Sequence, residues 1–237
     1  MPDPKLDTEA HRTHLYGRRK GKRLRTSLRN ALTHDLPLVR INPDVFEQPF
    51  DPRTLFSEDI TRVWFEIGFG GGEHLATQAQ LNPDVGFIGA EIFENGIASL
   101  LKKRTEASLE NIGILDSDAR EFLPKLAENC LDRVFLLYPD PWPKAKHAKR
   151  RFINQFTLDH LARVMTPGAE LRIATDHPEY TRWCLRQIPV HRAFQWDVSG
   201  PESWQHRPKD MVSTRYEKKA VREERAPVYL NFFRTSG

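Results

Sequence analysis

The chain has 237 residues and a formal net charge of +4, and its length suits one α/β domain with extensions. The first residues lack the apolar segment of a signal peptide, and no stretch approaches the roughly 18 apolar residues that span a bilayer. We therefore expect a soluble, cytoplasmic protein. The only cysteines, Cys130 and Cys184, lie far apart, which argues against a disulfide framework or a zinc site.

Residues 1–35 form a basic arm. Between Glu9 and Asp35 the chain has eight basic residues and no acidic one. Because this segment has little apolar periodicity, we expect it to be flexible unless a partner neutralises it. A targeting or solubilising tail is the alternative. Four prolines within residues 36–60 then indicate a loop-rich connector at the start of a single domain, 36–237.

From residue 62 the pattern becomes regular. Short β-branched and aromatic runs at 63–67, 86–92, 112–116, 133–138 and 170–175 alternate with helix-length segments near 72–81, 94–107, 119–128, 151–165 and 178–188. Five such units predict a parallel sheet. Two further strands, 193–198 and 228–233, would pair like a hairpin and add an antiparallel strand at one edge. We predict an α/β, Rossmann-like fold: a doubly wound, seven-stranded, mostly parallel sheet with helices on both faces.

Ligands of such sheets bind where the strands end, and a glycine-rich segment, 66–72 (EIGFGGG), follows the first strand. A dinucleotide fingerprint starting at Gly68 would require glycine at position 73, which is Glu73, and no Gly-Lys-Ser/Thr follows as in a P-loop. The carboxylate of Glu66 disfavours a pyrophosphate and attracts a ligand with an amine and a sulfonium. The segment therefore indicates S-adenosylmethionine, with Gly68 allowing the backbone to approach it.

Two further acids follow the next strands in register. Glu91 ends the second strand, where a carboxylate can accept both ribose hydroxyls. Asp118 follows the third strand and is placed to accept the adenine amine, although a helix cap is the equally weighted alternative for Asp118 alone. Acids on three successive βα units strengthen the prediction of this cofactor.

The fourth strand ends in Tyr138-Pro139-Asp140-Pro141-Trp142, at the place where methyltransferase folds present the acceptor atom. Trp142 either stacks on RNA or packs under the loop. A basic cluster follows at the same predicted edge of the sheet, and we expect its side chains to grip RNA phosphates. Its members are Lys144, Lys146, Lys149, Arg150 and Arg151.

The motifs FEIGFGGGEHL (65–75), YPDPWPKAKHAKRR (138–151), ATDHPEY (174–180) and STRYEKKA (213–220) together resemble the bacterial tRNA (guanine-N7)-methyltransferases, class I enzymes, over most of the chain. The resemblance implies methyl transfer from S-adenosylmethionine to N7 of guanine 46 in the tRNA variable loop. It implies that Glu66, Glu91, Asp118 and Asp140 contact or frame the cofactor and that Asp140 is also catalytic. It implies a substrate site made of Lys144, Asp176, Thr214, Arg215, Tyr216 and Glu217.

Guanine N7 carries a free lone pair and no proton at neutral pH, so its attack on a sulfonium methyl group needs no general base. We therefore expect catalysis by positioning and electrostatics. Asp140 could accept hydrogen bonds from the N1–H and N2–H₂ edge of guanine, or it could bind the ammonium group of the donor. Both roles stay open at this stage.

Several alternatives compete with these predictions. Asp176 could cap the helix that opens at Pro178, and residues 214–220 could be a solvated turn. The nine histidines have no partnered acid or nucleophile, so we predict no metal site, and no obligate protein partner is indicated. The alternative functions are another RNA methyltransferase on the same fold and a non-catalytic RNA-binding protein. A nicotinamide-dependent oxidoreductase is disfavoured by the missing glycine and the basic arm.

Overall fold

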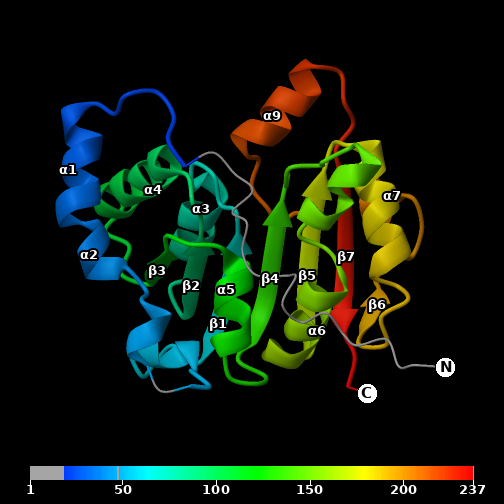
Figure 1. Cartoon of the computed structure of the whole chain (residues 1–237), viewed down its shortest axis with the longest axis horizontal. Coiled ribbons are helices and arrows are strands. Elements are labelled where there is room, and N and C mark those ends of the chain that lie inside the picture. The colour runs from blue at the N-terminus through cyan, green and yellow to red at the C-terminus, as the bar shows by residue number, and fades with distance from the viewer. Residues whose placement is uncertain (1–18, 47, 237) are drawn as a thin grey trace.

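A seven-stranded sheet with the order β3-β2-β1-β4-β5-β7-β6 forms the centre of the molecule (Figure 1). The computed structural model describes residues 19–46 and 48–236. The strands β1 to β5 are parallel, and β7 runs antiparallel to both β5 and β6. Their bounds are β1 Arg62–Ile67, β2 Val85–Ala90, β3 Ile112–Leu115, β4 Leu131–Leu137, β5 Met165–Thr175, β6 Phe194–Trp196 and β7 Val228–Arg234.

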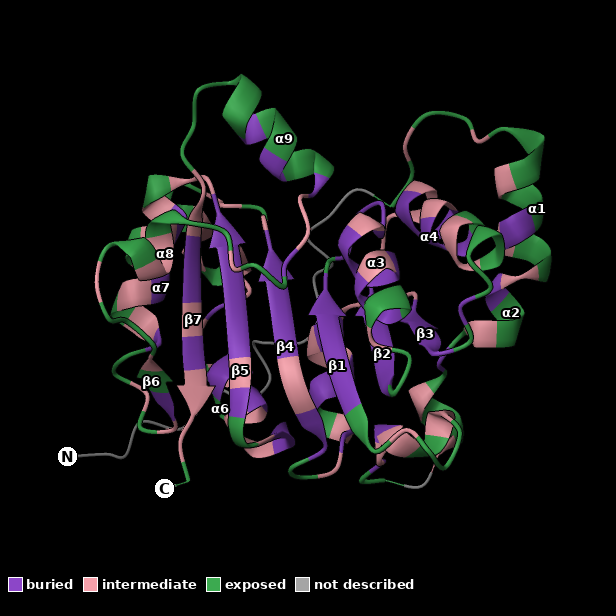
Figure 2. Cartoon of the chain, turned by 180° about the vertical axis from the view of Figure 1, so that it is seen from behind, coloured by how far each residue is buried: buried purple, intermediate pink, exposed green. Residues whose placement is uncertain are grey.

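Helices cover both faces of this sheet. The helices α1 (Thr26–His34), α2 (Leu36–Val39), α3 (Glu73–Leu81) and α4 (Glu94–Glu106) contribute to one apolar cluster, and α5 (Ala119–Phe122), α6 (Gln155–Val164) and α7 (Pro178–Gln187) to the other. Figure 2 shows that the central strands are buried along most of their length. Burial on both faces is typical of parallel strands and explains their near-continuous apolar runs. The predicted fold class is confirmed.

The predicted βα units are present, and two of their helices differ in extent. The helix expected near 119–128 ends at Phe122 and continues as a 3₁₀ turn, Leu123–Lys125, because Pro124 cannot donate a backbone hydrogen bond within a helix. The helix expected from 151 begins at Gln155 instead. Asn154 caps it, since its side chain accepts a hydrogen bond from the backbone N–H of Thr157.

The remaining elements were not predicted. They are the 3₁₀ helices Pro43–Val45, Pro52–Leu55 and Ala145–Arg150, and the helices α8 (Glu202–Gln205) and α9 (Arg215–Arg222). None of the helices within residues 19–46 and 48–236 has the length and the apolar run that a membrane span requires.

Part of the predicted basic arm forms a helix and contacts the domain in the structure. α1 packs against α4 through buried Ala31. The segment before α1 is fixed to the start of α4. Gly21 N–H donates to Asn95 Oδ1 (2.9 Å), and Asn95 Nδ2 donates to the carbonyl of Lys22 (2.8 Å). The prediction of flexibility also concerns residues 1–18, which lie outside the described residues.

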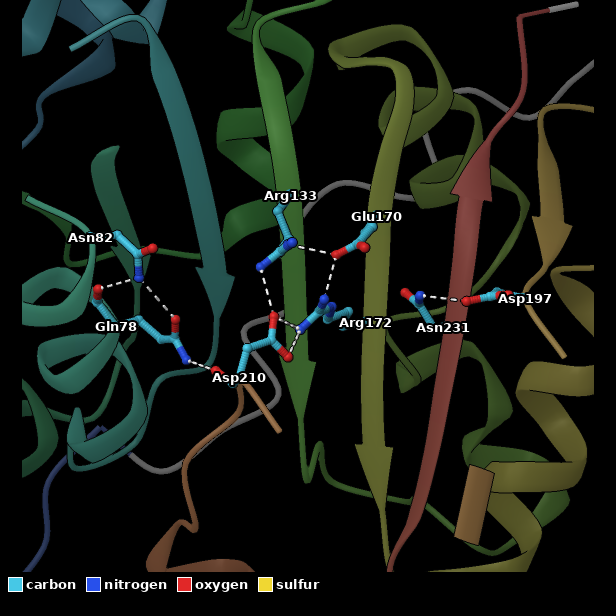
Figure 3. Close-up of polar contacts among 8 residues, drawn as sticks. All are labelled: Gln78, Asn82, Arg133, Glu170, Arg172, Asp197, Asp210 and Asn231. Carbon is cyan, nitrogen blue, oxygen red and sulfur yellow. Dashed lines mark hydrogen bonds and ion pairs between the residues drawn. The ribbon is translucent and has the colours of Figure 1, made fainter. Parts of the chain in front are cut away.

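The two halves of the sheet face seen in Figure 2 are covered differently. α3 and α4 lie over β1, β2 and β3, whereas no described helix lies over the middle of β4 and β5. Arg133 of β4 and Arg172 of β5 project there and contact Asp210 from the loop before α9 (Figure 3). This ion-paired loop takes the place of a covering helix.

Candidate methyl-transfer site

The carboxyl ends of the five parallel strands meet at one edge of the sheet. The strand order reverses between β1 and β4, and doubly wound sheets bind ligands in the crevice at such a point. Two adjoining pockets lie at this edge and share Gly68, Glu91, Ile92, Pro139 and Asp140. We call the two pockets together the cleft.

The loop between β1 and α3 turns through left-handed backbone, which favours glycine. The φ angles of Gly68 and Gly70 are 70° and 57°. A Cβ atom on Gly68 would meet no atom within 4 Å, whereas one on Gly70 would lie 3.0 Å from Cε2 of Tyr216. Gly68 therefore presents bare backbone to open space in the cleft, as a closely approaching ligand requires.

Glu91 fastens this glycine loop to the end of β2. Its Oε2 accepts a hydrogen bond from Gly70 N–H (2.8 Å), and its Oε1 accepts from the N–H groups of Ile92 (2.8 Å) and Phe93 (3.0 Å). Burial raises the pKa of Glu91, and these three donors partly oppose the rise. The carboxylate lines both pockets, so it is positioned to accept further hydrogen bonds from a ligand.

Asp118 is a helix cap and also lines the cleft. It caps α5, because its Oδ1 accepts a hydrogen bond from Arg120 N–H at 2.9 Å. The Arg120 guanidinium also pairs with it, with Nε at 3.0 Å from Oδ1 and Nη2 at 2.5 Å from Oδ2. Both residues line the cleft. The cap on α5 and the Arg120 pair therefore fix this carboxylate at the wall of the cleft, and contact with a cofactor stays a prediction.

Glu66 does not line the cleft. Its side chain points to the α3 side of the sheet, where its Oε2 lies 2.7 Å from Nδ1 of His74, and both residues are buried. Neither pocket at the strand ends includes it. The alternation of side chains along a strand explains the difference, because Ile67 and not Glu66 faces the pocket. In this structure Glu66 supports the start of α3 from behind the glycine loop.

Asp140 occupies the junction of the two pockets. Its surface is exposed at the mouth of the cleft, yet its carboxylate loses enough water on the cleft side to raise its pKa. Among the described residues, no hydrogen bond or ion pair involves this carboxylate. It is thus available to a ligand, whereas Glu66, Glu91 and Asp118 already have partners within the protein.

The walls of the cleft are partly apolar. Ile92, Ala119 and Phe152 line it beside the carboxylates. Trp142 is half-buried and also lines the cleft, with the guanidinium of Arg150 4.7 Å above its ring and the ring of His147 edge-on at 5.7 Å. An apolar wall between polar groups suits a ligand that joins a flat heterocycle to charged ends.

The predicted phosphate-binding cluster divides into two groups. Lys144, Lys146 and Lys149 are exposed on and beside the 3₁₀ helix Ala145–Arg150, and their contact with RNA stays a prediction. Arg150 lines the cleft instead. The prediction for Arg151 is wrong, because this side chain is only 2% exposed and its Nη2 donates to the carbonyl of Trp142 (3.0 Å). A run of like charges in the sequence does not reveal which member turns inward.

Asp176 follows β5 at the same edge and pairs with Arg225, with 2.6 Å between its Oδ2 and Nε. It does not cap α7. That role belongs to His177, whose Nδ1 accepts a hydrogen bond from Glu179 N–H at 3.2 Å. The alternative of a cap at Asp176 is therefore wrong, and the acid links the end of β5 to the segment after α9.

The segment 214–217 begins a helix rather than a turn. Two of its side chains are buried, and the other two lie at the surface or the cleft. Thr214 caps α9, since its Oγ1 accepts from Glu217 N–H at 3.1 Å, and both side chains are buried. Glu217 also pairs with Arg207 Nη1 at 2.7 Å. Tyr216 lines the cleft, with the Arg215 guanidinium 5.0 Å above its ring. Only Arg215 and Tyr216 of the four are free to meet a substrate directly.

The sequence reasoning missed the cationic partners of the predicted acids. Arg120, Arg207 and Arg225 hold Asp118, Glu217 and Asp176 respectively. Arg120 was detectable in principle, because an arginine two residues after a capping acid can fold back onto it, but no local signal marks the other two. Within residues 19–46 and 48–236, no group of three His, Cys, Asp or Glu side chains is arranged to hold a metal ion.

Comparison with known proteins yields close relatives across nearly the whole chain. A family model described as "Putative methyltransferase" matches residues 61–230. The tRNA (guanine-N(7)-)-methyltransferase of Rhodospirillum rubrum is 45% identical over 233 residues, which cover 98% of this chain and 91% of that protein. The protein of the same name from Roseobacter denitrificans is 46% identical over 234 residues, which cover 96% and 98%.

Solved structures show the same fold at much lower identity. The 16S rRNA (adenine(1408)-N(1))-methyltransferase from Catenulisporales acidiphilia has a TM-score of 0.53 and 16% identity, covering 83% of this chain and 94% of that one. An rRNA methylase from Streptococcus thermophilus has a TM-score of 0.52 and 11% identity, covering 75% and 89%. These likenesses establish the class I methyltransferase fold and no more.

Proposed function

The chain belongs to the tRNA (guanine-N(7)-)-methyltransferase family, and from this membership we propose that it transfers a methyl group from S-adenosylmethionine to N7 of guanine 46 in the variable loop of tRNA. The observation that carries the proposal is Asp140, a carboxylate without a protein partner among the described residues, at the junction of the two pockets of the cleft. A tRNA substrate also supports a cytoplasmic location.

The residues that line the cleft suit this cofactor, which supplies an electrophilic methyl group on a sulfonium. Gly68 offers bare backbone to the open space, and Glu91 offers acceptor sites for ribose hydroxyls. Asp118 would accept the adenine amine, beside the apolar surfaces of Ile92 and Phe152. Glu66 would act only through the glycine loop, because it faces His74.

Because guanine N7 has no proton to lose, the residues of the cleft need only hold the base and the donor in line and exclude water. Asp140 can serve in either of two ways. Of the two pockets that it lines, one contains Asp118 and the other contains Tyr216, and Glu91 lines both. This shared position supports contact with the donor's ammonium group on one side and with the edge of guanine on the other.

The RNA backbone would lie across the rim of the cleft. Lys144, Lys146 and Lys149 are exposed on the segment that also carries the cleft-lining Trp142 and Arg150, and Arg215 lies over the ring of the cleft-lining Tyr216. Such contacts fix the position of the RNA without reading its sequence. We also propose that residues 36–237 form the methyltransferase domain and that residues 1–35 form a basic arm, whose part from Arg19 onward is docked on α4.

A methylation assay tests the proposal. Purified protein is incubated with unmodified tRNA and labelled donor, and the modified nucleotide is mapped by nuclease digestion and mass analysis. We expect a single 7-methylguanosine at position 46 and no methylation when this guanine is replaced by adenine. Methylation at another position would instead indicate a different RNA methyltransferase. Binding of tRNA without methylation or donor affinity would indicate a non-catalytic RNA-binding protein.

A further inference from the structure

The loop that carries Asp140 is strained at both of its ends. Tyr138 has a φ angle of 52° and Trp142 one of 41°. Left-handed backbone at bulky residues is strained, and it persists only where surrounding contacts impose it. Between these two residues lies Pro139-Asp140-Pro141, in which both proline rings restrict φ. The loop is therefore stiff, and its direction depends on what holds its ends.

One end is held by the sheet. The Tyr138 N–H donates a hydrogen bond of 2.7 Å to the carbonyl of Ala174 at the end of β5. This bond continues the pairing of β4 with β5 by one residue. Asp140 therefore lies only two residues after Tyr138, whose backbone this bond fixes.

The other end is held by Arg151. Its Nε donates to the carbonyl of Pro141 (3.1 Å), and its Nη2 donates to the carbonyl of Trp142 (3.0 Å). The guanidinium lies 4.6 Å above the ring of Trp183 in α7, and its Nη2 is 3.8 Å from Oε1 of Glu179. Since Arg151 is 2% exposed, these contacts are made away from water, where hydrogen bonds from a charged donor are strongest.

We propose that Arg151 is a positioning residue for methyl transfer: it clamps the strained Pro141-Trp142 backbone from behind and so fixes the direction of the Asp140 carboxylate in the cleft. The clamp rests on the proposed function, because Asp140 is the group whose position it sets. Lysine cannot replace it. Only a planar guanidinium supplies two donors in a fixed fork and a flat face that stacks on Trp183.

A matched control exists in Arg163 of α6. Its guanidinium also donates to backbone carbonyls, with Nη1 at 2.6 Å from Leu126 O and Nη2 at 2.9 Å from Leu123 O. These carbonyls belong to the segment after α5, and neither they nor Arg163 line the cleft. Arg163→Lys therefore removes a similar clamp with no consequence for Asp140.

The experiment compares Arg151→Lys with Arg163→Lys in donor affinity by calorimetry, in kcat and KM for tRNA, and in the salt dependence of tRNA binding. For Arg151→Lys we expect kcat to fall about 100-fold, as misplacement of a positioned group produces, and donor affinity to fall as well. Affinity for tRNA and its salt dependence should be unchanged. Arg163→Lys should lose a comparable amount of thermal stability and keep kcat.

Chemical rescue separates positioning from folding. Added guanidinium ion at millimolar concentration should restore part of the kcat of Arg151→Ala and none of the activity lost through instability in Arg163→Ala. An unchanged kcat and donor affinity in folded Arg151→Lys would overturn the clamp, as would equal kcat losses in both lysine variants. If the wild type fails to methylate tRNA, the proposed function fails, while the donor affinity of Arg151→Lys still decides whether the clamp exists.

Discussion

At the scale of single residues, the predicted acids divide by whether the protein already satisfies them. Glu66, Glu91, Asp118 and Asp176 each have a hydrogen bond or an ion pair within the described structure. Asp140 has none, and burial on its cleft side raises its pKa. A folded-state pKa above the ordinary value means that the charged form opposes folding at neutral pH. A group that weakens the fold and lines a cleft is a strong candidate for function.

We expect Asp140→Asn to abolish most of the activity without destabilising the protein. The amide keeps the shape of the side chain but loses the charge, so kcat/KM for tRNA should fall at least about 100-fold. Denaturant unfolding at pH 7 should show equal or slightly higher stability, because a carboxyl group with a raised pKa loses its stabilising contribution as pH rises through that pKa. Asp84→Asn is the control, since Asp84 pairs with Arg62 far from the cleft. Substantial activity in Asp140→Asn would contradict this role.

The same pKa shift predicts the acid limb of the reaction. If the carboxylate form of Asp140 is the active one, kcat/KM should fall as pH decreases, with a midpoint above the range of an exposed aspartate. The residual activity of Asp140→Asn should not show this limb. Measurement of kcat/KM from pH 4.5 to 8 in both proteins checks the assignment. An identical acid limb in the two proteins would mean that a group other than Asp140 causes it.

At the scale of elements, the sequence was enough to place the acids relative to the ends of the strands, because each predicted strand fixes where the next loop begins. The direction of a charged side chain within a short irregular segment was not readable. On and beside the 3₁₀ helix Ala145–Arg150 the lysines are exposed, whereas Arg151, directly after it, turns inward. α9 was missed although Thr214 and Glu217 have the spacing of a capping box. In the structure Thr214 accepts a hydrogen bond from Glu217 N–H, as in that motif, whereas the Glu217 carboxylate pairs with Arg207.

The exposed lysines of the 3₁₀ segment provide a prediction about RNA binding. Each phosphate contact removed should reduce the magnitude of the slope of log K against log salt by about one unit. The double variant Lys144→Ala with Lys149→Ala should therefore reduce it by about two and weaken the binding of all tRNAs alike. Lys102→Ala is the control, because Lys102 lies within α4 and pairs with Glu106 at 3.5 Å. Filter binding across a salt series measures the slopes. Equal slopes in the double variant and the wild type would place the RNA elsewhere.

At the scale of the whole molecule, one face of the sheet has no described helix over the middle of β4 and β5, and this part of the face is connected to the cleft through the loop before α9 (Figure 2). On this part of the sheet face, Arg172 Nη1 lies 2.8 Å from both carboxylate oxygens of Asp210, Arg133 Nη1 lies 3.3 Å from Oδ2, and Gln78 donates to the Asp210 carbonyl (Figure 3). The loop that these contacts hold leads, four residues later, to the cap of α9. Long-range ion pairs of this kind have no local signal, so sequence patterns predicted the sheet but not the position of α9.

We expect Asp210→Ala to loosen α9 while leaving the sheet intact. Burial of Asp210 opposes its ionisation, but Arg172 and Arg133 outweigh this effect and lower its pKa, so the ion pairs persist at neutral pH. Their loss should accelerate hydrogen exchange in residues 206–222 and raise the Kd for tRNA about tenfold, which corresponds to roughly 1.4 kcal/mol. Exchange in β1 and β4 should not change.

Asp197→Ala is the control. It removes a contact with Asn231 on the same face (3.2 Å) that is not connected to α9, and it should leave both the hydrogen exchange of residues 206–222 and the Kd for tRNA unaltered. Unchanged exchange in residues 206–222 of Asp210→Ala would show that α9 is held by its own contacts, through Glu217 with Arg207, rather than by the loop on this part of the sheet face.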